Sequence, residues 1–161
     1  MTSQDNDQLL RFVERFAMVM EEAGLPRMAA RVFAYVLAED SDHYTAAELA
    51  EGLRVSRAAI SGAVRVLVQT GMLTRQRRPG SRVDEYRIDD DDVWAAINDQ
   101  RVPYLYRWAD AIAEGVDLVG RDTRGGRRLR QSQAYFLFMA EELPKLVERW
   151  HREKDRLTED V

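Results

Sequence analysis

The sequence contains no cysteine and only two histidines, His43 and His151, which lie far apart along the chain. Disulfides, thiolate catalysis and zinc sites with thiolate ligands are therefore excluded, and a cluster of histidine ligands is not expected. Glycine-rich phosphate loops, His-Glu-x-x-His motifs, nucleophile elbows and candidate catalytic triads are also missing. These absences predict a protein that is not an enzyme and that uses no cofactor and no metal ion.

Long apolar runs are missing as well. No stretch approaches the ~18 consecutive apolar residues that a membrane span requires, and the first residues lack the basic segment and apolar core of a signal peptide. We therefore expect a cytoplasmic protein with no membrane partner. With 161 residues, 45% hydrophobic and 32% charged, the chain has the composition of an ordinary folded protein.

Charge is distributed unevenly along the chain. The net charge of −4 argues against a nucleic-acid partner, since nucleic-acid-binding domains are usually basic. Residues 54–87, however, carry eight arginines against two acids, whereas residues 1–53 carry four against ten. A short segment that concentrates positive charge is typical of a surface that binds a polyanion.

The first forty residues predict two helices. Apolar residues recur at helical spacing between Leu9 and Ala23, and Gly24 is suited to end this helix. Pro26 fits the first turn of a second helix, whose apolar stripe runs from Ala29 to Leu37.

Residues 45–71 carry the pattern of a helix-turn-helix. Thr45 and Glu48 match the capping box that begins a helix. Ser56 can cap the next helix, and Gly71 can supply the left-handed residue that ends it. The three residues between the two helices, 54–56, are a turn of the length that the motif requires.

A basic β-hairpin is expected directly after the second helix. Residues 72–76 and 82–88 have strand character, and Pro79-Gly80-Ser81 between them is a turn signal. A basic hairpin in this position is the wing of a winged helix-turn-helix.

The rest of the chain is expected to be helical. The acidic run Asp89 to Asp92 fits the start of a helix, an interpretation that we prefer to an all-oxygen metal site. A further helix is expected over 102–119, and then a mobile basic loop over 121–130 that is solvated or touches flanking DNA. The last helix carries an apolar heptad stripe, and Pro144 either kinks this helix or begins a new one.

The residues from Thr45 to Leu73, with Arg78 to Arg82 and Tyr86 to Ile88, resemble the MarR superfamily of winged-helix repressors, most closely its GbsR-like branch. The likeness is specific across residues 25–97. It implies a bacterial transcription regulator with a mainly helical fold and a small β-hairpin wing. In this fold residues 1–24 form an N-terminal dimerisation helix, residues 25–100 the winged helix-turn-helix and residues 101–161 a helical dimerisation region. One departure is that many MarR wings carry Asp-x-Arg before the second strand, where this chain has Gly80-Ser81-Arg82.

DNA-binding residues are expected on the second helix of the motif and on the wing. The helix enters the major groove, with Arg57 favoured for a base and Arg65 for the backbone. The wing lies along phosphates, with Arg78 or Arg82 near the minor groove. A solvated helix face and a charged edge strand that resists aggregation are the alternatives. The predicted residues are Ser56, Arg57, Ala58, Ser61, Gly62 and Arg65 on the helix, and Arg75, Arg77, Arg78, Ser81 and Arg82 on the wing.

The terminal helices present more apolar stripe than they need among themselves, which predicts a homodimer that binds an inverted repeat of double-stranded DNA. The expected interface residues are Phe12, Phe16, Leu105, Trp108, Phe136, Met139, Leu143, Leu146 and Trp150. The resemblance further implies release from DNA by a small-molecule effector. Its pocket could be lined by Tyr35, Tyr104, Tyr106, Trp108 and Tyr135, although aromatic residues at helical spacing are more often core.

The predicted function is that of a sequence-specific transcription regulator, with repression as an inference from the family. The alternative is a winged helix that has become a protein-interaction module, an anti-regulator that does not bind DNA specifically. Retardation of random duplex at low salt separates the two.

Overall fold

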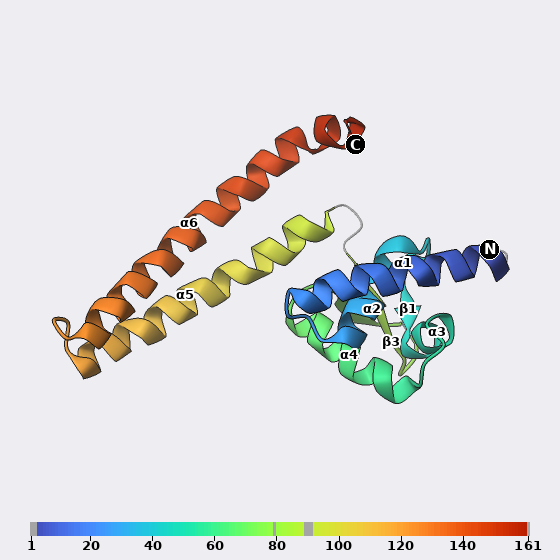
Figure 1. The fold of residues 1–161 in the computed structure, drawn as a ribbon, viewed down its shortest axis with the longest axis horizontal. Coiled ribbons are helices and arrows are strands. Elements are labelled where there is room, and N and C mark those ends of the chain that lie inside the picture. Colours follow the sequence, from blue (N-terminus) through green and yellow to red (C-terminus); the bar gives the residue numbers. More distant parts are fainter. Residues whose placement is uncertain (1–2, 79, 89–91, 161) are drawn as a thin grey trace. The chain divides into compact units, whose positions relative to one another are not determined.

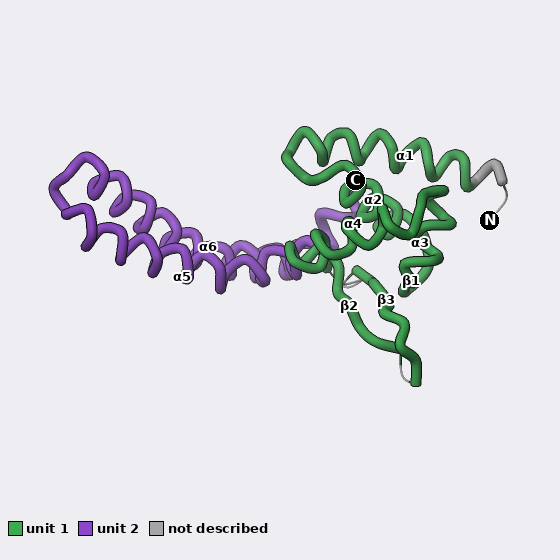
Figure 2. Tube along the Cα trace, turned by 90° about the horizontal axis from the view of Figure 1, so that it is seen from below, with its two compact units in different colours: residues 1–93 green, residues 94–161 purple. Residues whose placement is uncertain are grey.

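The computed structural model describes residues 3–78, 80–88 and 92–160. The chain divides into two compact units, Met1–Val93 and Trp94–Val161 (Figure 2). Across the described residues, no helix combines the length and the apolar character that a membrane span needs.

The first unit is a helical body with a small sheet (Figure 1). Its elements are α1 (Ser3–Glu22), α2 (Arg27–Ala38), β1 (Tyr44–Thr45), α3 (Ala46–Gly52), α4 (Arg57–Gln69), β2 (Thr74–Arg77) and β3 (Asp84–Arg87). The sheet is antiparallel in the order β1-β3-β2. The mainly helical fold with a hairpin wing is thus confirmed. The two-residue strand β1 was not predicted.

The predicted helix signals act as expected. Thr45 and Glu48 form the capping box, because Glu48 N–H donates to Thr45 Oγ1 (3.2 Å) and Thr45 N–H donates to Glu48 Oε2 (2.7 Å). Ser56 Oγ accepts from the N–H of Ala59 at the start of α4. Gly24 and Gly71 have φ values of +98° and +73°, so both end their helices in the left-handed conformation that glycine tolerates best.

The core of this unit is built by the inward faces of the helices. Its largest fully buried side chains are Val13, Val32, Phe33, Leu49, Leu53, Ile60 and Leu67. Arg31 reinforces this packing, because its Nε lies 2.7 Å from Glu14 Oε1 on α1 and its Nη2 donates to the carbonyl of Leu53. The first helix is therefore tied both to α2 and to the helix-turn-helix.

The second unit consists of two long helices, α5 (Val93–Val119) and α6 (Arg124–Glu159), which lie side by side in Figures 1 and 2. They pack through an edge-to-face contact of Trp108 with Phe136, whose ring centroids are 5.3 Å apart. Leu105 and Val116 of α5 and Val147 of α6 are buried in this unit.

For this unit, two predictions from the sequence are wrong, and one question that the sequence left open, the role of Pro144, is answered. A helix begins after the acidic run as expected, and residues 102–119 are helical, but the separate start at Val102 is wrong, because α5 runs from Val93 through Pro103 to Val119. The mobile loop expected over 121–130 is also wrong, since Thr123 caps α6 and the residues from Arg124 onward are helical. Pro144 lies inside α6, so it does not begin a new helix. Both prolines remove one helical hydrogen bond without ending the helix.

A tight turn between the two helices explains the glycine pair that suggested a loop. A Cβ atom built on Gly126 would lie 2.0 Å from the carbonyl oxygen of Gly120, so only glycine fits there. Gly120 itself has a φ of +85°, and Thr123 Oγ1 donates to its carbonyl (2.9 Å).

The acidic run falls largely outside the described residues. Asp89, Asp90 and Asp91 lie outside the described residues, and of the four acids only Asp92 is described. Among the residues that the structure describes, no three His, Cys, Asp or Glu side chains gather as a metal site would need.

Candidate nucleic-acid interface

One face of α4 is exposed over its whole length, as its periodicity predicts. Its opposite face is buried through Ile60, Ala63, Val64 and Leu67. Gln69 at the end of α4 is exposed, and so are all six residues that the sequence assigned to the recognition helix, namely Ser56, Arg57, Ala58, Ser61, Gly62 and Arg65. Arg57 and Arg65 form no ion pair with any described residue, so both guanidinium groups are available to a ligand.

Gly62 has no structural reason to be glycine. It is not in the left-handed conformation, and a Cβ atom built on it would meet nothing within 4 Å. A glycine inside a helix costs roughly 0.5–1 kcal/mol relative to alanine. The protein's own packing therefore does not require a glycine at this position.

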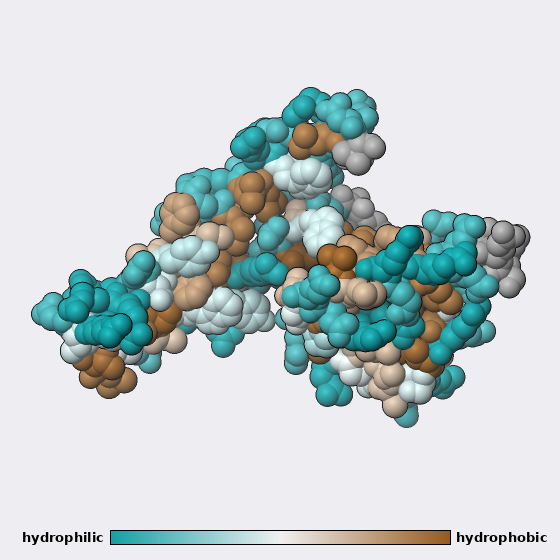
Figure 3. All heavy atoms as spheres, in the orientation of Figure 1, coloured by the Kyte–Doolittle hydropathy of each residue, from teal (hydrophilic) through white to brown (hydrophobic). Residues whose placement is uncertain are grey.

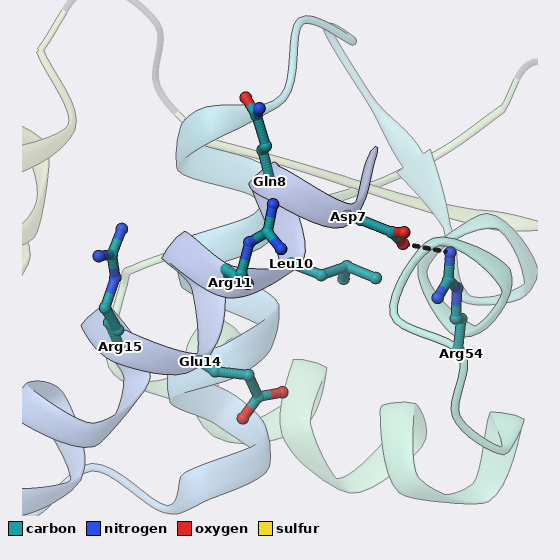
Figure 4. A pocket seen from close by; sticks show the side chains of 7 residues that line it. All are labelled: Asp7, Gln8, Leu10, Arg11, Glu14, Arg15 and Arg54. Carbon is teal, nitrogen blue, oxygen red and sulfur yellow. Dashed lines mark hydrogen bonds and ion pairs between the residues drawn. The ribbon is translucent and has the colours of Figure 1, made fainter. Parts of the chain in front are cut away.

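The turn that precedes α4 contains a residue that the sequence did not single out. Arg54 has a φ of +55°, a backbone conformation that residues other than glycine and asparagine rarely adopt. Its Nη2 lies 2.9 Å from Asp7 Oδ1 of α1 (Figure 4). The shallow groove around this pair is lined by three arginines and two acids, so its excess of positive charge is small.

The wing carries its arginines on exposed positions, but three of them have carboxylate partners. Asp84 lies 3.8 Å from Arg75 and 3.6 Å from Arg77, and the Arg78 Nε donates to Glu85 Oε1 at 2.6 Å. The remaining predicted wing residues are Ser81, which is partly exposed, and Arg82, which is exposed and forms no ion pair with a described residue. The sequence showed the arginines but not their pairing.

A groove brings the recognition helix and the wing together. It is lined by Ser61 and Arg65 of α4, by Arg75 of β2 and by Asp84 and Tyr86 of β3. Two of the predicted phosphate contacts, Arg65 and Arg75, therefore border the same groove. A sugar-phosphate backbone that passes between a major-groove helix and a wing meets cations of this kind on both sides.

The residues proposed for an effector pocket are divided between the two units. Tyr35 is a core residue of the first unit, 7% exposed, and its ring packs edge-to-face on Tyr44. Burial raises the pKa of the Tyr35 hydroxyl, with smaller contributions from Glu39 and Glu51. Tyr104, Tyr106, Trp108 and Tyr135 are exposed on the second unit.

The residues expected at a dimer interface also differ in exposure. Leu105 is buried within the second unit, where it packs inside the protomer. Large apolar side chains remain exposed on the same unit, and Figure 3 shows hydrophobic groups on the visible face of its helices. The predicted residues that are at least partly exposed are Phe12, Phe16, Trp108, Phe136, Met139, Leu143, Leu146 and Trp150.

Comparisons with known proteins agree with this geometry. A model of the MarR family matches residues 23–82, and a model described as an MmpR5-like MarR family transcriptional regulator matches residues 92–153. The chain is 27% identical over 132 residues to the HTH-type transcriptional regulator MmpR5 of Mycobacterium tuberculosis, which spans 81% of this chain and 79% of the relative. A crystal structure of a transcriptional regulator superposes with a TM-score of 0.79 at 25% identity, over 90% of this chain and 99% of the other.

Proposed function

Because this chain belongs to the MarR family of transcriptional regulators, which bind DNA and are not enzymes, we propose that it is a homodimeric repressor that recognises an inverted repeat. In this proposal α4 of each protomer enters the major groove, and the two recognition helices are spaced by about 34–36 Å, one turn of DNA. The likeness to the GbsR-like branch stays a prediction, since the matching model is the MmpR5-like one.

The observation that carries the proposal is the exposed face of α4 with two arginines, Arg57 and Arg65, that form no ion pair with a described residue. Arg57 lies in the first turn of α4, the end that enters the groove, and a guanidinium there can donate two hydrogen bonds to one guanine. Arg65 lies two turns later and shares the groove with Arg75 of the wing. We therefore assign Arg57 to a base, and Arg65 and Arg75 to the backbone.

The wing residues divide by their partners. Arg82 has no carboxylate partner among the described residues, which favours it for the narrow, electronegative minor groove. Arg78 is held at Glu85 and is assigned to a phosphate, and Arg77 and Ser81 are assigned to the same backbone. These assignments keep all the wing residues predicted from the sequence and give each of them a specific contact on DNA.

Dimerisation in this proposal uses the apolar side chains that the protomer leaves exposed on α1, α5 and α6. A two-fold dimer places the same patch of both protomers in contact, so one exposed apolar patch serves both halves of the interface. Release by a small-molecule effector is part of the proposal, with Tyr104, Trp108 and Tyr135 as its candidate residues. Tyr35 would join them only if the core of the first unit opens, because it is buried there.

The test is selection of bound sequences from a random duplex library by the full chain, followed by the affinity of the selected sequence. An inverted repeat with half-sites about ten base pairs apart supports a dimeric operator-binding regulator. Failure to retard any duplex at low salt overturns the proposal and supports the protein-interaction module instead.

Two variants test the assigned roles. Arg57→Ala is expected to weaken binding and to relax the preference at one base position, whereas Arg78→Ala is expected to weaken binding evenly across sequences. Equal loss on operator and on random duplex for Arg57→Ala contradicts its assignment to a base.

A further inference from the structure

Glu85 is the buried charged residue of the described part of the chain. It lies on β3, the central strand, opposite Thr45 of β1 and Gln76 of β2, and is 5% exposed. A carboxylate in such a place is costly unless a cation and hydrogen bonds compensate its charge. The partners of Glu85 therefore decide what this residue does.

Two basic side chains, Arg78 and His43, approach the same carboxylate oxygen of Glu85. Arg78 Nε donates to Glu85 Oε1 at 2.6 Å, which is a short, charge-assisted hydrogen bond. His43 Nε2 lies 3.7 Å from that oxygen and adds a second charge when protonated. Arg78 thus has a fixed anchor, while about half of its side chain (51%) remains exposed.

The anchor leaves most of the arginine free to donate. A guanidinium has five N–H donors, and the Nε of Arg78 uses one of them on Glu85. The charge of Arg78 also reaches Glu48 of the α3 capping box. The pKa of Glu48 is lowered chiefly by the hydrogen bond from the Thr45 backbone, and Arg78 contributes to the same direction. The charge of Arg78 therefore acts on Glu48 of α3 as well as on Glu85 of β3.

The neighbouring carboxylate behaves differently. Asp84 is 31% exposed in its side chain and lies 3.8 and 3.6 Å from Arg75 and Arg77, beyond hydrogen-bond distance. It is a diffuse counter-charge that does not hold either arginine in one geometry. The wing thus contains two adjacent acids, of which only Glu85 fixes a cation.

We infer that Glu85 is a positioning residue for DNA binding. It orders the Arg78 side chain before DNA arrives, so that the remaining donors of the guanidinium can bind a phosphate at a smaller cost in side-chain entropy. The inference rests on the proposed function. An arginine that is already ordered loses less conformational entropy when it binds, and the planar fork of its terminal nitrogens suits a phosphate.

Neutralising Glu85 should weaken DNA binding, which is the opposite of what the loss of a negative charge usually does. Removing a carboxylate beside bound DNA removes a repulsion and normally strengthens binding. For Glu85 the positioning effect has the opposite direction. Asp84 supplies a matched control one residue away, because Asp84→Asn removes the same charge from the same strand without releasing an anchored arginine.

The experiment compares Glu85→Gln and Asp84→Asn in the full chain, with duplex affinity measured at several salt concentrations and far below the unfolding temperature of each variant. Glu85→Gln is expected to weaken binding about three- to ten-fold, as a partly exposed charge-assisted contact is weakened. Asp84→Asn is expected to bind as tightly as the parent or tighter. In an Arg78→Ala background, Glu85→Gln should cause no further loss.

Arg78→Lys gives a second test that leaves the buried acid intact. Lysine keeps the charge but cannot donate to Glu85 through an Nε while presenting a fork to phosphate, so its loss should match that of Glu85→Gln. Tighter binding by Glu85→Gln overturns the inference, as does an equal loss with and without Arg78. If the parent protein binds no duplex at all, the proposed function itself fails.

Discussion

Gly62→Ala should have opposite effects on the stability of the fold and on the affinity for DNA. Gly62 lies inside α4 on its exposed face, and a methyl group there would touch nothing within 4 Å in the protein. Alanine should therefore stabilise the helix by roughly 0.5–1 kcal/mol, since glycine loses more backbone entropy on folding. For a chain of this size that gain corresponds to about 2 °C in Tm.

The same methyl group should weaken binding if α4 docks on DNA through this face. A close approach that must give way by one methyl costs at least about 1 kcal/mol, which is a five-fold or larger loss of affinity. Thermal unfolding followed by circular dichroism and duplex binding followed by fluorescence anisotropy measure the two effects on the same samples. The expected result is a higher Tm together with a higher Kd.

Gly125→Ala is the matched control. Gly125 lies in the first turn of α6, in the other unit, and its new Cβ would meet only ordinary contacts at 3.8 Å. DNA affinity should be unchanged in this variant. The reasoning is refuted if Gly62→Ala raises the Tm and leaves duplex affinity as it was, because the glycine would then serve neither the fold nor a close approach.

Three further predictions concern other parts of the chain. Gly126→Ala should destabilise the second unit by about 2 kcal/mol or more, because its Cβ would lie 2.0 Å from a backbone oxygen, and a urea titration that shows no change contradicts the tight turn. Glu48→Gln should cost stability at neutral pH and not at acid pH: the lowered pKa means that the ionised form stabilises the fold above the ordinary carboxyl pKa, and this advantage is lost as pH falls through the lowered value. The difference in urea midpoint between parent and variant at both pH values checks the sign. Leu146→Asp, at a side chain 57% exposed, should shift the mass measured by light scattering from dimer to monomer, and an unchanged dimer removes this face of α6 from the proposed interface.

Local signals explain why so much of the first unit could be predicted. The capping box of Thr45, the cap of Ser56 and the left-handed Gly71 act within four residues of their own position, so the sequence alone specifies them. The strand β1 could not be predicted, because two residues carry no periodicity and exist as a strand only by pairing with β3. The short turn around Arg54 was predicted in length but not in its left-handed conformation.

The second unit was harder to predict because its signals conflict. Pro103 and the pair Gly125-Gly126 normally favour helix ends or loops, and both lie inside helices here. The reason for Gly126 is a contact with Gly120, which only the folded turn creates. Tertiary packing along the Trp108 and Phe136 contact offsets the lost hydrogen bond and the low propensity, and no local pattern reveals that packing.

In the candidate site, the exposure of residues could be predicted from the sequence, whereas their ion pairs could not. Periodicity places all six recognition-helix residues on one exposed face. The ion pairs of the wing depend instead on strand register, which sets Arg77 directly opposite Asp84 and Gln76 opposite Glu85. A shift by one residue would exchange the faces of the two acids, so the buried Glu85 could not be identified before the register was known.

This pairing limits how much of the charge in residues 54–87 acts on DNA. Arg54, Arg75, Arg77 and Arg78 have carboxylate partners, whereas Arg57, Arg65, Arg82 and Arg87 form no ion pair with a described residue. Affinity should fall with salt by about 0.9 log units per phosphate neutralised and per log unit of salt. In the proposed complex Arg65, Arg75, Arg77 and Arg78 of each protomer contact phosphates, so the slope should correspond to at most four phosphates per protomer. It should be smaller if Asp84 and Glu85 keep balancing the charge of their partners in the complex. A slope that requires all eight arginines would mean that Asp7 and Asp84 release Arg54, Arg75 and Arg77 on DNA.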